Sequence, residues 1–209
     1  MLSQVYLLKQ FILTYNLSVM IRAGYNDKML VVDILSNSFN DNMSVNYIIK
    51  QDRKRLQRIK RLMEYSFEVC MMFGDVFLSE DRKACALILM PDKKKTNFKS
   101  ILLDIKLITS CIGLSNIKKA LQRESKINRL HPKELMYYLW FIGVDPNEQN
   151  KGIGSKLLGD IINEAMKNNG SIYLETSTLK NIPWYEKLGF EIYNELDLGY
   201  KSYFLKKAI

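Results

Sequence analysis

The chain has little of the residue types on which several common chemistries depend. It contains one histidine, His131, and three cysteines in 209 residues. An odd number of widely spaced cysteines without a C-x-x-C pair argues against a disulfide framework. We expect Cys70, Cys85 and Cys111 to be buried, reduced thiols of a cytoplasmic protein. A thiol nucleophile would have only His131 as an activating imidazole.

Long hydrophobic runs are also missing. The first nineteen residues are apolar but are interrupted by Gln4, Lys9, Gln10 and Asn16. No apolar stretch approaches the roughly 18 to 20 residues that a membrane-spanning helix needs. A basic n-region and a small-residue cleavage site, the marks of a signal peptide, are not evident. We therefore expect residues 1–18 to be an N-terminal extension, residues 19–209 to form a single domain, and no membrane to be a partner.

The composition is otherwise that of a folded globular protein. Apolar residues make up 47% of the chain and charged residues 25%, so disorder and low complexity are excluded. The excess of 31 basic over 22 acidic residues gives a net charge of +9, which favours a negatively charged partner such as nucleic acid, an anionic membrane or a phosphate-bearing ligand. Nucleic acid is the weakest of these, because the basic residues near position 55 lie opposite an apolar helical stripe and are typical of a solvated face. We expect no nucleic-acid partner.

The order of periodic segments predicts an α/β protein. Helices are expected over 27–39, 52–72, 97–110 and 113–129, and strands over 19–22, 76–78 and 84–90. The continuous apolar run 135–144 predicts a central strand buried on both faces. A helix over 152–168 and a strand over 171–176 complete a right-handed βαβ crossover. A short helix over 182–188 and strands from 190 and over 200–205 follow. We expect a mixed central β-sheet of about six or seven strands flanked by helices, with residues 97–130 as a helical insertion before the central strand.

The segment Gln149-Asn150-Lys151-Gly152-Ile153-Gly154, between the central strand and its crossover helix, is typical of a phosphate-binding turn. Helix N-termini expose unpaired N–H groups and a partial positive charge, and glycines let a ligand approach the backbone. A dinucleotide-binding fingerprint would need a third glycine where Leu157 stands, although Glu175 lies where its ribose-binding acid would be. The P-loop pattern is missing as well. A plain structural turn with two glycines remains the alternative.

Two motifs together resemble the GNAT superfamily of N-acetyltransferases. The run from Ile142 through Pro146 to the Gly152-Ile153-Gly154 turn resembles its acyl-CoA pyrophosphate loop. The segments 174–177 and 181–190 resemble its second signature, with Thr178 where the family commonly has an asparagine. Within the superfamily, His131-Pro132-Lys133-Glu134 and the 97–130 insertion are similar to bacterial enzymes of the puromycin N-acetyltransferase type.

The resemblance implies a GNAT fold and acetyl-CoA as the cosubstrate. It implies that the central strand and the strand at 171–176 diverge, and that the pantetheine arm lies in the gap between them. The cofactor-binding residues that it implies are main-chain groups of the central strand, the phosphate-binding turn and one residue before the last helix: Ile142, Gly143, Val144, Gln149, Asn150, Lys151, Gly152, Ile153, Gly154, Ser155 and Asn181. It implies no metal.

The resemblance also implies a catalytic tyrosine. Tyr185 matches the family's proton donor to the leaving thiolate, and a phenol is protonated at neutral pH and able to donate. A core tyrosine is the alternative. The base that accepts the amine proton stays open among Glu134, Glu175 and His131, and we name Glu134 with Tyr185 as the catalytic pair.

The function implied is acetyl transfer from acetyl-CoA to a primary amine of a small molecule, by direct attack in a ternary complex. The alternatives are a protein lysine or N-terminal acetyltransferase and a non-catalytic acyl-CoA-binding module. We expect a cytoplasmic monomer or homodimer.

Overall fold

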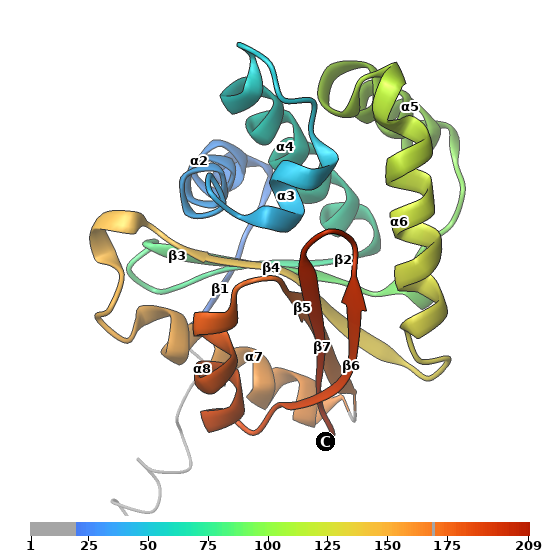
Figure 1. Ribbon diagram of the computed structural model, residues 1–209. Coiled ribbons are helices and arrows are strands. Elements are labelled where there is room, and N and C mark those ends of the chain that lie inside the picture. The colour runs from blue at the N-terminus through green and yellow to red at the C-terminus, as the bar shows by residue number, and fades with distance from the viewer. Residues whose placement is uncertain (1–19, 169) are drawn as a thin grey trace, which may run out of the picture.

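The computed structural model describes residues 20–168 and 170–209, and it confirms a mixed α/β architecture. The sheet has seven strands in the order β1-β2-β3-β4-β5-β7-β6 (Figure 1). Only the β4–β5 pair is parallel, and the other neighbours are antiparallel. The strands are β1 (Ile21–Arg22), β2 (Gly74–Leu78), β3 (Ala84–Leu89), β4 (Met136–Val144), β5 (Ser171–Thr176), β6 (Glu191–Asp197) and β7 (Lys201–Lys207). The extension expected at 1–18 lies outside the described residues.

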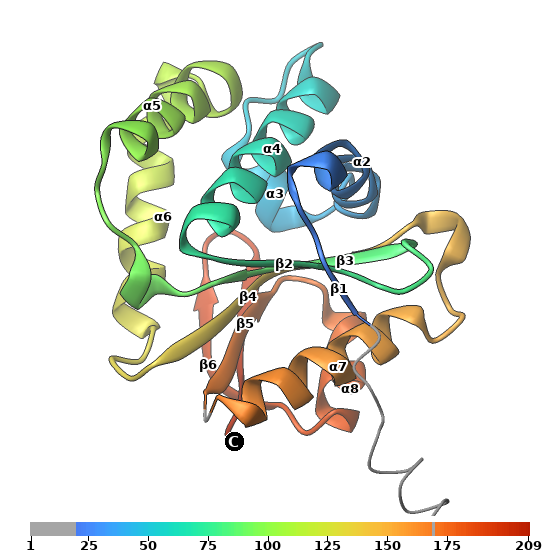
Figure 2. The same ribbon diagram turned by 180° about the vertical axis from the view of Figure 1, so that it is seen from behind.

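Helices cover both faces of this sheet. One face carries α2 (Lys28–Ser38), α3 (Met43–Ile48) and α4 (Arg55–Phe73), and the other carries α7 (Ile153–Lys167) and α8 (Ile182–Lys187) (Figures 1 and 2). The insertion between β3 and β4 contributes α5 (Phe98–Leu107), a π-helical turn (Ile108–Ile112) and α6 (Ile117–Leu130), which form one flank of the molecule. The short α3 was not predicted from the sequence.

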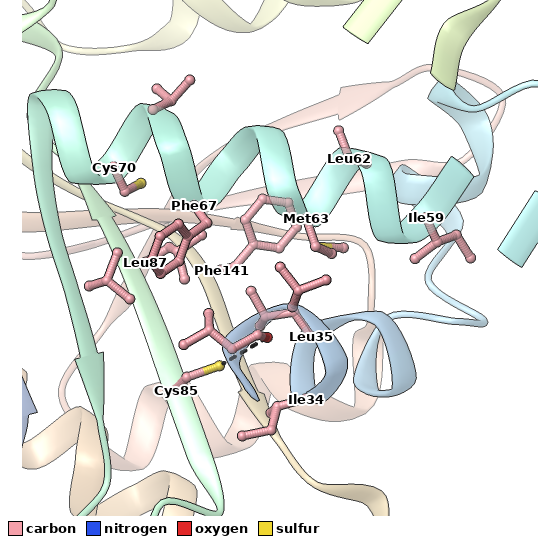
Figure 3. Packing of buried hydrophobic residues seen from close by; sticks show 14 of the residues in the cluster. Ile34, Leu35, Ile59, Leu62, Met63, Phe67, Cys70, Cys85, Leu87 and Phe141 are labelled. Carbon is pink, nitrogen blue, oxygen red and sulfur yellow. Dashed lines mark hydrogen bonds between the residues drawn. The ribbon is translucent and has the colours of Figure 1, made fainter. Parts of the chain in front are cut away.

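The core on the α2 and α4 face is built from the predicted helical stripe. Ile59, Met63, Phe67 and Cys70 of α4 are buried against β3, β4 and α2 (Figure 3). Leu56, predicted in the same stripe, is exposed at the first turn of α4.

All three cysteines are free and buried, as expected. Burial raises the pKa of the Cys70 and Cys85 thiols and raises that of Cys111 to about 11. They are therefore protonated core residues and unsuited to nucleophilic attack at neutral pH.

The opposite face has its own core, which packs α7 and α8 on the sheet. The buried residues of α7 lie three and four apart, as an amphipathic helix requires: Leu157, Leu158, Ile161, Ile162 and Ala165. They join Tyr185 of α8 and Phe190 in one cluster with the sheet.

The insertion is tied to the domain by polar contacts. Asn97 caps α5, since its side chain accepts a 2.8 Å hydrogen bond from the Ser100 amide while Ser100 Oγ accepts one from the Asn97 amide. Arg58 of α4 donates to the Ser110 carbonyl at 2.9 Å, and the Tyr65 hydroxyl donates to Asp104 at 2.7 Å. These bonds hold α5 and the π-helical turn against α4.

Candidate functional site

The two central strands diverge halfway along their length. β4 and β5 pair in parallel from Met136–Ser171 only as far as Leu139–Leu174. On their outer edges, β5 pairs with β7 from Ile172 to Thr176 and β4 pairs with β3 from Tyr138 to Val144. Within the described chain, the β5-facing edge of β4 therefore has no strand partner beyond Leu139. The divergence implied by the sequence resemblance is confirmed.

A β-bulge lies at the point of divergence. Leu87 of β3 pairs with Phe141, whereas the next residue, Ile88, pairs with Leu139, so Trp140 is an extra residue on β4. A bulge bends its strand and increases its twist. Trp140 therefore marks where β4 turns away from β5.

The hydrogen-bond alternation of β4 decides which main-chain groups face the open edge. The Asp145 amide donates to the Lys83 carbonyl at 2.8 Å. Because hydrogen-bonded and non-bonded pairs alternate in antiparallel strands, Gly143 also turns its main-chain groups toward β3. Ile142 and Val144 turn theirs toward the open edge, where the Val144 carbonyl accepts a 2.7 Å bond from Ser38 Oγ.

Gly143 was predicted to contact the cofactor through its main chain, but it has a packing role in the structure. A Cβ atom there would lie 2.9 Å from Leu35 Cδ2 and 3.0 Å from Ser38 Oγ. The glycine lets α2 pack closely on β4, and its amide and carbonyl face Cys85 of β3 rather than the gap. Of the three predicted positions on this strand, Ile142 and Val144 supply the open edge.

The turn before α7 presents a row of free amides. Asn150 and Gly152 adopt positive φ angles of 63° and 80°, the left-handed region that glycine enters without strain. Among the described residues, none of the amides from Gln149 to Ser155 donates a hydrogen bond to a carbonyl or side chain. Added to the positive end of the α7 dipole, these amides form an anion-binding turn.

The two glycines of the turn serve different purposes. A Cβ atom at Gly152 would meet no other atom within 4 Å, so its backbone angle is what requires glycine. A Cβ at Gly154 would lie 3.1 Å from Val144 Cγ2, so this glycine lets α7 begin close to the open edge of β4. The Lys151 ammonium pairs with Glu148 at 2.7 Å and remains half exposed.

Tyr185 is buried on α8 and its hydroxyl is free. Its ring packs on Trp184 and Phe190, with centroids 4.6 and 5.7 Å away. The hydroxyl has no hydrogen-bond partner among the described residues. Burial raises its pKa well above the ordinary value near 10, so the phenol stays protonated.

Further unpartnered polar groups lie between β5 and α8. Ser177 Oγ, two residues after Glu175, is buried without a partner, which is costly unless a ligand satisfies it. Asn181, the residue before α8, makes no side-chain capping bond and is free to contact a ligand. With the free amides and the open edge, these groups fit the diphosphate and amide-bearing arm of acetyl-CoA. Ser177 ends the 174–177 segment of the second signature, but it was not among the predicted site residues.

On the other face of the sheet, Glu175 is the centre of a buried polar cluster. Its Oε1 accepts hydrogen bonds from the Tyr138 hydroxyl at 2.9 Å and from His131 Nε2 at 3.0 Å. Burial, followed by the charge of Glu175, raises the pKa of Tyr138 well above 10, so Tyr138 stays a donor. Two of the three base candidates are therefore in contact. The third, Glu134, is exposed two residues before β4 and accepts a hydrogen bond from the Tyr173 hydroxyl.

Arg123 of α6 extends this cluster to two other elements. Its Nη2 lies 3.9 Å from Glu175 Oε2 and donates to Ser44 Oγ of α3 at 2.6 Å. Its Nε donates to the hydroxyl of Tyr200, in the β6–β7 turn, at 3.0 Å. The Tyr200 ring also contacts Tyr47 of α3, with centroids 5.2 Å apart. Sequence reasoning proposed Tyr47 as a lining residue of the acceptor pocket but missed Arg123, Ser44 and Tyr200, because the cluster joins three separate segments without a local motif.

Comparison with known proteins agrees with this geometry. A family model described as an acetyltransferase (GNAT) domain matches residues 112–192. An uncharacterised N-acetyltransferase of Schizosaccharomyces pombe is 44% identical over 54 residues, which are 26% of this chain and 22% of that protein. The chain thus matches less than a quarter of the length of this curated relative.

Solved structures resemble the whole domain. One structure, described as histone acetyltransferase HPA2 and related acetyltransferase from Corynebacterium glutamicum, matches with a TM-score of 0.69 at 21% identity. The match covers 90% of this chain and 94% of that chain. Arylalkylamine N-acetyltransferase 2 from Aedes aegypti matches with a TM-score of 0.62 at 16% identity, over 91% of this chain and 98% of that chain. The chain has the GNAT fold, and the part of it over residues 112–192 matches the family model of an acetyltransferase domain.

Proposed function

We propose that this enzyme transfers the acetyl group of acetyl-CoA to a primary amine of a small molecule, by direct attack in a ternary complex. One observation carries the proposal: the free amides of the Gln149–Ser155 turn occur together with the unpaired edge of β4 and with Tyr185, whose neighbour Trp184 is hydrogen-bonded to Ser155 of the turn. Bound acetyl-CoA would supply an acetyl group activated as a thioester.

Tyr185 holds the proton that the leaving sulfur needs. A buried phenol remains neutral through the physiological range and has no competing acceptor within the described chain. It can therefore donate as negative charge develops on the sulfur, which is general acid catalysis.

Glu175 accepts the proton that the amine must lose. Its hydrogen-bond partner Tyr138 packs on the α2 and α4 core, whereas Tyr185 packs on the α7 and α8 core, so the two groups lie on opposite faces of the sheet. Its carboxylate is held in place by Tyr138 and His131, so it meets the amine in one orientation. An acid and a base on opposite faces of the sheet suit an amine that arrives from one face and a thiol that leaves toward the other.

The closure over Glu175 favours a small acceptor. The β6–β7 turn, α3 and α6 meet through Tyr200, Ser44 and Arg123. An extended peptide would need an open channel between the turn and α3, where Tyr47 and Tyr200 are in contact. This closure supports a small amine over a protein substrate, as does the sequence likeness to enzymes of the puromycin N-acetyltransferase type. The cytoplasmic location and the absence of a metal stay predictions.

The proposal is tested by measuring free thiol from acetyl-CoA with a panel of acceptors. The panel pairs small primary amines (arylalkylamines, polyamines, amino acids and aminonucleosides) with peptides that carry a free N-terminus or a lysine. Turnover of small amines alone supports the proposal. Turnover of peptides alone would make the enzyme a protein acetyltransferase, and acetyl-CoA binding without thiol release from any acceptor would make it a non-catalytic module.

A further inference from the structure

The flank formed by residues 91–130 carries most of the excess positive charge of the chain. It contains ten lysines and arginines against three acidic residues, a net +7 out of the formal +9. We call it the insertion flank. It comprises the segment before α5, α5 itself, the π-helical turn and α6, and it stands along one side of the molecule (Figures 1 and 2).

Most of these cations are not neutralised by the protein. Lys99 pairs with Glu68 at 3.2 Å, Lys119 lies 3.7 Å from the centroid of the Tyr47 ring, and Arg123 belongs to the Glu175 cluster. The other seven have no carboxylate within 4.0 Å in the described part of the chain: Lys93, Lys94, Lys95, Lys106, Lys118, Lys126 and Arg129. Their charge is available to an external partner.

An apolar stripe lies on the outer side of α5. Phe98, Ile101, Leu102 and Ile105 recur at intervals of three and four and are all exposed, Phe98 by 83%. They lie on the side of α5 opposite Leu107, which packs on the core. Lys99 and Lys106 are three and four residues from Leu102, so lysines border the stripe. Leu114 and Leu121 add exposed apolar side chains on the α6 half of the flank.

An exposed apolar helical stripe on a flank that is rich in unpaired lysines is the pattern of a helix that lies in the surface of an anionic membrane. No single helix of the described chain is long and apolar enough to span a bilayer. The two halves of the flank, Phe98–Ile112 and Leu114–Leu130, reach that length and apolarity only when taken together, and they are bent by 100° relative to each other. We propose that the insertion flank docks on an anionic lipid surface, with the α5 stripe in the interface and the lysines on the lipid headgroups.

Two other occupants fit the observations less well. Nucleic acid would use the lysines but would leave the apolar stripe exposed to water. A second copy of the chain would cover the stripe but would bring a second set of unpaired lysines against the first. The proposal differs from the expectation, drawn from the missing long hydrophobic runs, that no membrane is a partner. It does not depend on the acetyl-transfer proposal.

Co-sedimentation of the full chain with lipid vesicles tests the proposal. Vesicles of phosphatidylcholine with about 30 mol% phosphatidylserine are compared with vesicles of phosphatidylcholine alone. We expect binding to the anionic vesicles only, and its loss at about 0.5 M salt, where charge attraction is screened.

Variants locate the binding on the flank. Two flank variants are compared with two controls of equal chemical change elsewhere on the surface. The apolar variant combines Leu102→Glu with Ile105→Glu, and its control combines Met29→Glu with Leu56→Glu. The charge variant replaces three lysines of the flank by serine: Lys93→Ser, Lys94→Ser and Lys95→Ser. Its control replaces three lysines elsewhere on the surface: Lys167→Ser, Lys187→Ser and Lys201→Ser. Each flank variant should weaken vesicle binding by roughly tenfold or more, and each control by much less. Circular dichroism and acetyl-CoA affinity establish that each variant is folded.

Three results would overturn the proposal. The first is no binding to anionic vesicles at low salt. The second is binding that the flank variants and their controls weaken equally. The third is a partner of another class: a dimer broken by the apolar variant, or DNA retention lost in the charge variant alone, in each case without vesicle binding.

Discussion

The indole nitrogen of Trp184 donates a 2.8 Å hydrogen bond to the hydroxyl of Ser155. This bond joins the start of α8 to the first turn of α7, so the anion-binding turn and the neighbouring Tyr185 are held as one unit. Ser155 was predicted to contact the cofactor through its amide, and the structure shows that its side chain is used to position α8.

Replacing Tyr185 by phenylalanine should lower turnover by roughly 10²-fold while acetyl-CoA affinity stays similar. The phenyl ring keeps the packing on Trp184 and Phe190, so only the proton donor is lost. Steady-state kinetics with calorimetric binding separate the two quantities. Unchanged turnover under conditions where chemistry limits the rate would remove Tyr185 from the acid role.

The Gly154→Val variant should abolish measurable acetyl-CoA binding. Its side chain would extend from a Cβ already 3.1 Å from Val144, and it would fill the space between the anion-binding turn and the open edge. The matched control is Gly159→Ala in the same helix, where a Cβ meets nothing within 4 Å. The control should bind normally and gain up to about 1 kcal/mol in free energy of unfolding. Intact affinity in a folded Gly154→Val protein would contradict the anion-binding assignment.

Glu175→Gln and Glu134→Gln should differ sharply in turnover. Glu175→Gln removes the proposed proton acceptor and should cost roughly 10²-fold near pH 7. The loss should shrink as pH rises, because more of the amine substrate is then already unprotonated. Glu134→Gln alters an exposed carboxylate and should leave turnover near the wild-type value. The reverse ranking would restore Glu134 to the base role that the sequence suggested.

The free energy of unfolding should fall as pH rises above about 9. Burial raises the pKa of Cys70, Cys85, Tyr138 and Tyr185 above their ordinary values near 8.5 and 10. The unfolded chain therefore releases these protons first, and the stability that the groups contribute is complete below the unfolded values and lost above them. Urea midpoints at pH 7, 9, 10 and 11 measure this, and a constant or rising midpoint would show that the groups are not buried in solution.

Much of the fold was predictable because its signals are local. The apolar run at 135–144, the α7 periodicity and the glycines of the turn each occupy one contiguous segment, and the structure places strand, helix and turn within a residue or two of the prediction. Motif spacing likewise placed Tyr185 on a short helix beside the turn.

The remaining features depend on contacts between distant segments. The main-chain groups of Gly143 face β3 because of the register between β3 and β4. The sequence of one strand does not determine that register. The Glu175 cluster joins residues of α3, α6, β4, β5 and the β6–β7 turn, so choosing Glu175 over Glu134 required the assembled sheet. The exposed stripe of α5 was hidden for the opposite reason, since an apolar helical period predicts a buried face and only the fold shows it uncovered.

The central claim is that free amides at the start of α7 hold the diphosphate of acetyl-CoA. Titration calorimetry of the enzyme with acetyl-CoA and with acetyl-pantetheine, which keeps the thioester arm but lacks the diphosphate and nucleoside, tests it most directly. The account predicts saturable binding of acetyl-CoA that is roughly 10²-fold tighter than that of acetyl-pantetheine, and no measurable binding of acetyl-CoA to Gly154→Val. Equal affinity for the two ligands, or no affinity for acetyl-CoA, would contradict it.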